Sequence, residues 1–330
     1  MKLLVFNCHE AWVYQLGVLN YELDIIVGLK GRYTDGWDER MRPVPKNGEI
    51  ITLHEALHSA DRYDCIITHN ITDMLDVKSL SGPRIIVLHS TLDGRLSEEV
   101  SKISPEKMKT LLLHYLELVG GHTVAVSQLK GDSWGLSGDI INSGVNTDDY
   151  LPFSGDKPKG LRICNEVSKR RKTLFWSFFE KAFSGIPMDI VGYNPDMQGV
   201  NPARNWNHLK EMLSSHRFYI HTADPRFEDG FNMATLEAMA AGMPILGNLH
   251  PTSPVEHGVS GFLSDDPDEL RAYAMMLITN RDLAMQMGKE ARRTVAKQFS
   301  LSRFKEKFER SIKIARRKFE AKRMISNGNR

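Results

Sequence analysis

One carboxylate stands alone in an apolar stretch in the second half of the chain. The stretch reads EDGFNMATLEAMAAG over residues 228–242, and between Asp229 and His250 the only charged side chain is Glu237. An ionised carboxylate is almost never fully buried unless it is paired or hydrogen-bonded. Glu237 therefore needs a partner, either inside the protein or on a ligand.

The residues beside Glu237 suit a nucleotide. Gly230 and Phe231 are predicted to start a helix, and the first backbone N–H groups of a helix bind anions such as phosphate. Gly230 lets a ligand approach the backbone, and Ala234 and Ala241 leave room beside Glu237 for a ribose diol. An ion pair between Glu237 and a buried arginine explains the same residues, so both interpretations stay open.

Several other site motifs are missing. The sequence lacks G-x-G-x-x-G, G-x-x-x-x-G-K-[ST], G-x-S-x-G and H-E-x-x-H. Their absence argues against nicotinamide or flavin dehydrogenases, P-loop NTPases, α/β-hydrolases and zinc metalloproteases. The cysteines Cys8, Cys65 and Cys164 match no metal or disulfide spacing, and the acidic run 264–269 predicts a helix start. No metal site is expected.

Composition is that of an ordinary soluble globular protein. The chain has 330 residues, 41% of them hydrophobic and 25% charged, and a net charge of +2. This length favours two domains, and the charge points to neither nucleic acid nor membrane. No run approaches the roughly 18 apolar residues of a membrane span, and the N-terminus lacks a cleavable signal. We expect a cytoplasmic protein.

Strand-like runs alternate with helical patterns along the chain. Before residue 150 the predicted strands are 3–7, 23–28, 64–68, 84–88, 122–126 and 138–142, with a helix at 104–119. After a linker at 151–160 the strands are 161–164, 188–191, 217–221 and 244–247, and the helices are 171–184, 207–214 and 231–241. This alternation predicts an α/β fold of two Rossmann-like, doubly wound parallel-sheet domains facing a cleft.

The expected domains are 1–152 on the acceptor side, 153–310 for the nucleotide sugar, and a basic C-terminal helix or tail over 311–330. Apolar residues recur every three or four positions from Leu301 to Phe319, which predicts one amphipathic helix in the stretch 301–330. Its basic face could contact anionic lipid at the inner face of the membrane. More often such a helix packs its apolar stripe on the core and leaves its charges solvated.

The segment 31–50 is predicted to be a long loop because it lacks a clear period. Its side chains could contact an acceptor or form only local ion pairs, and the residues concerned are Trp37, Asp38, Arg40 and Arg42.

Four motifs stand in order along the chain. They are Val124-Ala-Val-Ser127 with Ile141-Asn-Ser-Gly-Val-Asn146, Asp229-Gly-Phe through Glu237-Ala-Met-Ala-Ala-Gly, Pro254-Val-Glu-His-Gly through Asp266-Pro-Asp-Glu-Leu, and Met287-Gly-Lys-Glu-Ala-Arg-Arg with Gln298-Phe-Ser. Together they resemble the retaining GT-B glycosyltransferases of the family-4 (group 1) type, over roughly residues 122–310. The second motif is similar to the E-x7-E signature of that family.

The resemblance implies roles for the residues of the second motif. Glu237 would bind the ribose of a nucleotide-diphosphate-sugar donor, with UDP- or GDP-sugars the expected donors. Asp229 would touch the donor sugar hydroxyls or the reacting centre. Gly230, Phe231 and Asn232 would present backbone amides to the sugar and diphosphate.

The family's basic pair falls on residues 164–172 of this chain. Asn165 stands where the family has its first arginine, and Arg170 or Arg171 would take the place of the phosphate-binding lysine. A guanidinium can clamp two phosphate oxygens at once.

The acceptor side resembles the family less. His89 follows a strand and is similar to the family's cleft histidine, which contacts the donor sugar or the acceptor; a histidine that only caps a strand end is the alternative. In place of the glycine pair after the first strand, this chain has a run that makes three further acceptor-side candidates, His9, Glu10 and Trp12.

The function implied is metal-independent transfer of a sugar from the donor to an acceptor hydroxyl, with retention of configuration, in glycan or glycoconjugate biosynthesis. The catalytic candidates are His89, Asp229 and Arg170, and the acceptor would be a glycan, a lipid-linked compound or another hydroxyl compound. Two alternatives remain: a sugar-nucleotide epimerase of GT-B architecture, which lacks the ordered motifs, and a catalytically silent sugar-nucleotide-binding protein. The departures at Asp229 and Asn165 favour the second alternative.

Overall fold

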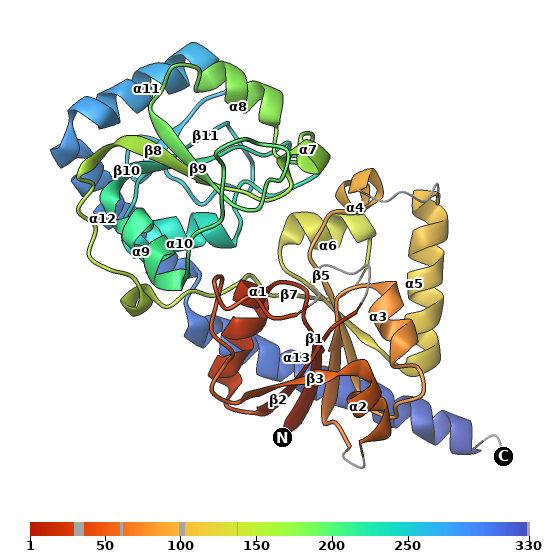
Figure 1. The fold of residues 1–330 in the computed structure, drawn as a ribbon. Helices are drawn as coiled ribbons and strands as arrows, with labels where there is room; N and C mark the ends of the chain where they lie inside the picture. Colours follow the sequence, from red (N-terminus) through yellow and green to blue (C-terminus); the bar gives the residue numbers. More distant parts are fainter. Residues whose placement is uncertain (30–35, 60–61, 99–102, 137, 329–330) are drawn as a thin grey trace. The chain divides into compact units, whose positions relative to one another are not determined.

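The chain forms two compact units, each a parallel sheet with helices on its faces (Figure 1). The computed structural model describes residues 1–29, 36–59, 62–98, 103–136 and 138–328. Unit 1 comprises Met1–Ser143 and Leu301–Arg330, and unit 2 comprises Gly144–Ser300.

Unit 1 is built on a seven-stranded parallel sheet in the order β3-β2-β1-β4-β5-β6-β7. Its strands are β1 (Lys2–Phe6), β2 (Glu22–Val27), β3 (Gly48–Thr52), β4 (Cys65–Thr68), β5 (Arg84–Leu88), β6 (His122–Ala125) and β7 (Asp139–Ile140). The strand order reverses at β1, because the chain adds β2 and β3 on one side and β4 on the other. Such a switch point places loop residues from β1 and β4 side by side at the carboxyl ends of the strands.

The helices of unit 1 follow local capping signals. They are α1 (Glu10–Gln15), the 3-10 helix η1 (Leu16–Leu19), α2 (Leu53–His58), α3 (Ile71–Asp76), α4 (Leu92–Glu98), α5 (Pro105–Val119), α6 (Gln128–Trp134) and α13 (Leu301–Gly328). At the start of α5, the Ser104 hydroxyl accepts the Lys107 N–H at 3.2 Å. Its end is set by Gly120, whose φ of 63° suits glycine.

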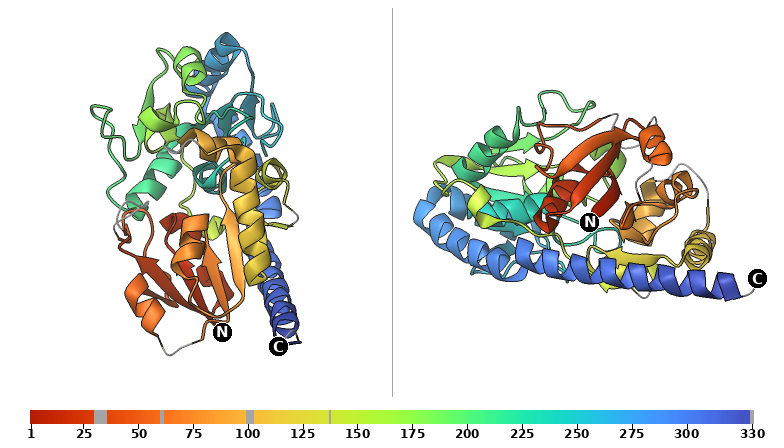
Figure 2. Two further views of the ribbon diagram at one scale, coloured as in Figure 1. Left: turned by 90° about the vertical axis from the view of Figure 1, so that its right-hand side faces the viewer. Right: turned by 90° about the horizontal axis from the view of Figure 1, so that it is seen from below.

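The last helix, α13, packs into unit 1 (Figure 2). The buried side chains of its apolar stripe join the cluster of Leu3 and Val5, and they are Phe304, Phe308, Ile312 and Ala315. Trp12 meets Phe304 and Phe308 edge to face, with ring centroids 6.4 and 6.1 Å apart. The helix thus buries its apolar stripe, as the second interpretation of the tail expects.

This packing corrects the expected domain limits. The first stretch of unit 1 ends at Ser143 rather than at residue 152, and unit 2 ends at Ser300 rather than at residue 310. The whole stretch from Leu301 belongs to unit 1. The first residues of the apolar stripe already lie in the unit 1 core, so a separate tail beginning at 311 does not exist.

Unit 2 is a five-stranded parallel sheet in the order β12-β11-β10-β8-β9. Its strands are β8 (Lys157–Ile163), β9 (Met188–Val191), β10 (His216–His221), β11 (Ile245–Gly247) and β12 (Gly261–Leu263). Its helices are η2 (Thr147–Asp149), α7 (Val167–Arg170), α8 (Trp176–Ala182), α9 (Trp206–Ser215), α10 (Met233–Ala241), α11 (Pro267–Thr279) and α12 (Arg281–Gln298).

Several local predictions differ from the structure. Strands β3 and β12 lie outside the predicted set, and β8 begins inside the expected linker at 151–160. Within the predicted helix 171–184 only α8 forms, over Trp176–Ala182, because the chain turns before it with Phe175 at φ 47°; the short helix α7 already ends at Arg170. Within the expected loop 31–50, residues 31–35 lie outside the described residues.

No helix in the described part of the chain has the length and apolar character needed to cross a membrane.

Candidate functional site

Glu237 lies inside unit 2 on α10, a helix buried along nearly its whole length. The helix begins at Met233, two residues later than predicted, and Asn232 is its N-cap: the Asn232 Oδ1 accepts the Thr235 N–H at 2.9 Å. All residues from Thr235 to Ala241 are buried, and Glu237 is 3% exposed. Its carboxylate stands four residues after the helix start, about 6 Å along the axis.

Two histidine rings hold the segment before α10, where Asp229 is 1% exposed. His221 Nε2 lies 3.2 Å from the Asp229 carbonyl oxygen, and His250 Nε2 lies 3.0 Å from that of Glu228. A carbonyl only accepts, so each ring donates its Nε2–H. Burial lowers the pKa of both rings, to about 4 for His221. Both stay neutral at pH 7 and fix the backbone on either side of the Glu228–Asp229 bond.

The backbone N–H of Gly230 already has a hydrogen-bond partner within the protein. This N–H donates to the Thr252 hydroxyl at 2.8 Å. A Cβ at this position would lie 2.8 Å from the His250 side chain, so the close approach that requires glycine is that of a histidine ring. The Phe231 side chain packs in the unit 2 core, 5.2 Å from Phe299 between ring centroids. To donate its N–H to a ligand, Gly230 would therefore have to give up its hydrogen bond to Thr252.

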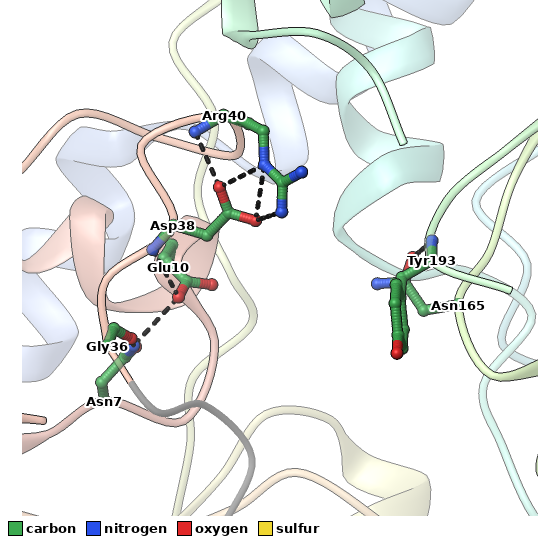
Figure 3. A network of polar contacts seen from close by, with 7 residues as sticks. All are labelled: Asn7, Glu10, Gly36, Asp38, Arg40, Asn165 and Tyr193. Carbon is green, nitrogen blue, oxygen red and sulfur yellow. Dashed lines mark hydrogen bonds and ion pairs between the residues drawn. The ribbon is translucent and has the colours of Figure 1, made fainter. Parts of the chain in front are cut away.

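Asn165 joins two loops at the carboxyl ends of β8 and β9. Its Oδ1 accepts the Tyr193 N–H at 2.8 Å (Figure 3). A Cβ on the neighbouring Gly192 would lie 2.6 Å from that Oδ1, which ties the loop closely to Asn165. In this chain Asn165 therefore holds the loop at Gly192 and Tyr193 in place.

Arg170 and Arg171 point to different partners. The Arg171 guanidinium forms a 2.8 Å ion pair with Glu180, and both side chains are about half exposed. The Arg170 guanidinium lies 3.8 Å from the Glu228 carboxylate, next to Asp229 in the chain. Of the two, Arg170 is the one that the fold brings toward the segment before α10.

In unit 1, His89 lies in a group of ring side chains at the carboxyl ends of neighbouring strands. Its Nε2 lies 2.9 Å from His69 Nδ1 and 3.7 Å from Cys8 Sγ. The Trp12 ring meets His89 edge to face at 5.0 Å between centroids. Burial lowers the pKa of His69 to about 3 and that of His89 well below its ordinary value. Both rings are neutral at physiological pH.

The other acceptor-side candidates take structural positions in unit 1. His9 is the N-cap of α1, and its carbonyl accepts the Val13 N–H at 3.0 Å. Glu10 is buried, and its Oε1 accepts the Asn7 amide at 3.0 Å and the Asp38 N–H at 3.2 Å (Figure 3). Trp12 is 3% exposed and packs in the core.

The loop candidates form a local ion pair. The Asp38 carboxylate accepts from the Arg40 Nε and Nη2 at 2.8 and 2.7 Å (Figure 3). The Arg42 guanidinium is buried and donates to the Met41 carbonyl, and the Trp37 indole donates to the Arg42 carbonyl at 2.7 Å. These contacts match the interpretation of a loop with local pairs.

Four side chains of these networks are missing from the sequence-based candidates: His69, His221, His250 and Thr252. His69 follows β4 directly, His221 ends β10, and His250 lies three residues after β11. Polar residues at the carboxyl ends of parallel strands are where such sheets bind ligands. The same rule that selects His89 would have selected these three histidines.

The comparisons with known proteins agree with this geometry. Residues 194–294, which include α10 and the segment before it, match the model of the family described as glycosyl transferases group 1. The trehalose synthases of Thermococcus litoralis and Pyrococcus furiosus are each 20% identical over 251 residues, 75% of this chain and 57% of theirs. The matched part thus spans little more than half the length of these relatives.

Solved structures share the fold. The sucrose-phosphate synthase of Thermosynechococcus elongatus superposes with a TM-score of 0.66 at 13% identity, covering 99% of this chain and 100% of that one. The HepE protein of Anabaena, solved in complex with UDP-glucose, gives 0.66 at 14% identity, covering 95% and 99%. The two parallel α/β sheets are therefore those of the GT-B fold, and residues 194–294 are the part of the chain that is similar to the group 1 glycosyl transferases.

Proposed function

We propose that this chain is a retaining glycosyltransferase that moves a sugar from a nucleotide-diphosphate sugar to an acceptor hydroxyl. The proposal rests mainly on the segment 228–237. There two buried acidic residues, Asp229 and Glu237, lie on either side of the N-terminal end of α10. That end of a helix favours a diphosphate. The match to the group 1 family covers the same segment.

Each residue has a distinct part in the proposed reaction. Glu237 accepts from the ribose hydroxyls, and the end of α10 together with Arg170 stabilises the charge that develops on the leaving diphosphate. Asp229, fixed through its backbone by His221, contacts the donor sugar. His89 serves the sugar or the acceptor from unit 1. The acceptor hydroxyl attacks the oxocarbenium-like sugar on the face from which the diphosphate departs.

A glycosidase mechanism fits these carboxylates poorly. Glycosidases use two carboxyl groups on either side of one bond, as acid and as nucleophile or base. Here Asp229 precedes the helix, and Glu237 belongs to its second turn with apolar neighbours on both sides. The two therefore suit different parts of one donor, the sugar and the ribose.

UDP- or GDP-sugars are the proposed donors, and no divalent metal is required for transfer. Structural neighbours are described in complex with UDP and with UDP-glucose, which supports a uridine nucleotide. Glycan or glycoconjugate biosynthesis in the cytoplasm is the proposed setting.

Contact with an anionic membrane through the polar face of α13 is part of the proposal. The apolar stripe of α13 is buried in the unit 1 core, so only attraction between its basic side chains and anionic lipid would hold it at a membrane. Co-sedimentation with phosphatidylglycerol vesicles, lost at high salt, is the expected result; equal sedimentation with neutral vesicles would contradict it.

Donor binding is tested by thermal shift against UDP-, GDP-, ADP- and dTDP-sugars. A donor that binds the folded state raises the apparent melting temperature. Glu237→Gln should lose that shift, because the neutral amide no longer accepts from both ribose hydroxyls. Glu256→Gln, at an exposed position of unit 2, is the matched control and should keep the shift. If Glu237→Gln and Glu256→Gln show the same increase in melting temperature, Glu237 does not bind the donor.

A further inference from the structure

Three neighbouring strands of unit 1 each place one soft or borderline ligand at the same edge of the sheet. Cys8 follows β1, His69 follows β4 and His89 follows β5, and β4 pairs with both other strands. The candidate ligand atoms of the three side chains all lie within 4.8 Å of one another. The spacing along the chain is too wide for any sequence motif, so only the topology reveals the group.

The distances between these atoms come close to those of a tetrahedral metal centre. Zinc–nitrogen bonds of about 2.0–2.1 Å and a zinc–sulfur bond of about 2.3 Å imply roughly 3.4 Å between two nitrogens and roughly 3.6 Å between nitrogen and sulfur. His89 Nε2 lies 3.7 Å from Cys8 Sγ and 2.9 Å from His69 Nδ1. The two rings need to separate by only about 0.5 Å, within the reach of a small rotation.

Metal-binding histidines usually donate the N–H of their other ring nitrogen to a nearby oxygen, and His69 has such a partner. His69 Nε2 lies 3.0 Å from the Phe6 carbonyl oxygen, which holds the proton on Nε2 and leaves the Nδ1 lone pair directed at the group. The His69 backbone N–H donates to the Asp73 carboxylate at 2.9 Å. Trp12 packs edge to face against both rings, at 5.1 Å and 5.0 Å between centroids.

Charge around the group favours a cation. Burial, and then the negative charges of Asp73 and Glu10, raise the pKa of the Cys8 thiol well above its ordinary value. All three ligand residues keep part of their surface exposed to solvent, although burial is the main cause of their pKa shifts. A divalent cation would displace the thiol proton and face two carboxylates in its surroundings.

We propose that Cys8, His69 and His89 form a binding site for one zinc-class divalent cation, with a fourth position open to water or another ligand. Sulfur and imidazole nitrogen together select zinc and its neighbours over magnesium or calcium. On binding, the Cys8 thiol loses its proton to solvent as the sulfur–metal bond forms, and the His89 proton passes from Nε2 to Nδ1. The ion then occupies His89 Nε2.

This site does not depend on the proposed transferase activity, but it has a consequence for it. Transfer needs no metal in that proposal, whereas a bound ion occupies a nitrogen of His89. Zinc should therefore inhibit transfer, and Cys8→Ser should transfer normally while losing sensitivity to zinc.

Cobalt is the direct probe of the site. Tag-free protein, stripped with chelator, is titrated with Co²⁺, and the expected result is one equivalent bound with a thiolate-to-cobalt charge-transfer band. Cys8→Ser should lose the band and weaken binding by more than the about 10–100-fold that the loss of an outer partner costs. Cys164→Ser, which removes a thiol from unit 2, should keep both.

A surface pair on α2 is the rival binder. His54 and His58 are exposed and stacked at 4.2 Å between centroids, at a spacing that chelates metal on helices. His54→Asn/His58→Asn should leave the cobalt spectrum unchanged. The proposal is overturned if the band is absent, if it persists in a folded Cys8→Ser protein, or if it disappears with the α2 pair; unchanged thermal melting shows that each variant is folded.

Discussion

His69 sets the orientation of the His89 ring. His69 Nδ1 lies 2.9 Å from His89 Nε2, and the opposite nitrogen of His69 lies 3.0 Å from the Phe6 carbonyl oxygen. Because that carbonyl only accepts, His69 carries its proton on Nε2, and its Nδ1 accepts from His89 Nε2–H. A residue after β4 thereby fixes both the tautomer and the direction of the proposed site residue after β5.

Removal of the His69 ring should therefore slow transfer without weakening donor binding. One hydrogen bond is worth about 1 kcal/mol, so we expect His69→Ala to lower kcat by roughly fivefold to tenfold. His69→Asn, whose side-chain oxygen can stand near the position of Nδ1, should restore part of the rate. Equal kcat in the wild type and a folded His69→Ala protein would show that His89 is oriented by other contacts.

The buried histidines should make the protein less stable in acid. Burial is the leading cause of a lowered pKa at His69, His89, His122, His216, His221 and His250. Below about pH 6.5 the unfolded chain binds protons that the folded chain refuses, down to about pH 4 for His221 and about pH 3 for His69. Stability is therefore present above this window and is lost as the pH falls through it.

Each histidine that is protonated only in the unfolded chain lowers the free energy of unfolding by about 1.4 kcal/mol per pH unit. Urea midpoints measured from pH 7 to pH 5 should fall, and His69→Asn should reduce the slope. His114→Asn, at an exposed site, is the control and should leave the slope unchanged. A midpoint that rises on acidification would contradict the assignment of these rings as buried and neutral.

Arg170 and Arg171 should differ in their effect on nucleotide binding. Arg171 is engaged in an exposed pair with Glu180, whereas Arg170 points toward Glu228 beside Asp229. A charge-assisted bond to phosphate contributes about 1.5–3 kcal/mol, so Arg170→Ala should weaken UDP binding by roughly 10–100-fold. Arg171→Ala should change it by less than about threefold. Calorimetric titration with UDP checks this, and the reverse order would place the clamp on Arg171.

The contact between α10 and α12 should tolerate no side chain at Gly288. A Cβ there would collide with the Gly242 carbonyl at the end of α10. Overpacking of this kind costs about 1–3 kcal/mol, and Gly288→Ala should lower the free energy of unfolding by that amount. At Gly36 no heavy atom lies within 4 Å of an added Cβ, so Gly36→Ala serves as the control. Unchanged stability of Gly288→Ala would mean that the helices separate easily.

The sequence predicts those features that depend on local pattern. The alternation of apolar strands and helices predicts two parallel-sheet domains, which the structure confirms, and the lone Glu237 is found buried on α10. Strands β3 and β12 escape prediction for different reasons: β3 has a largely exposed run, and β12 has only three residues.

Features that depend on tertiary contacts are not visible in the sequence. The meeting of Cys8, His69 and His89 follows from the strand order, since Cys8 and His89 are 81 positions apart in the sequence. The placement of α13 in unit 1 depends on an apolar stripe that fits the core of a domain begun 300 residues earlier. Gly230 illustrates a third case, because its close neighbour is the His250 ring, twenty positions away.

Glycosyl transfer is tested most directly by measuring nucleotide release from UDP- and GDP-sugars in the presence of EDTA, with and without candidate acceptor sugars. We expect the wild type to release the nucleoside diphosphate. Asp229→Asn should lose about 100-fold or more of this release while it retains donor binding, and Glu237→Gln should lose both. Glu256→Gln should behave as the wild type. Donor binding without release by the wild type, or equal release by Glu237→Gln, would contradict the proposed transfer.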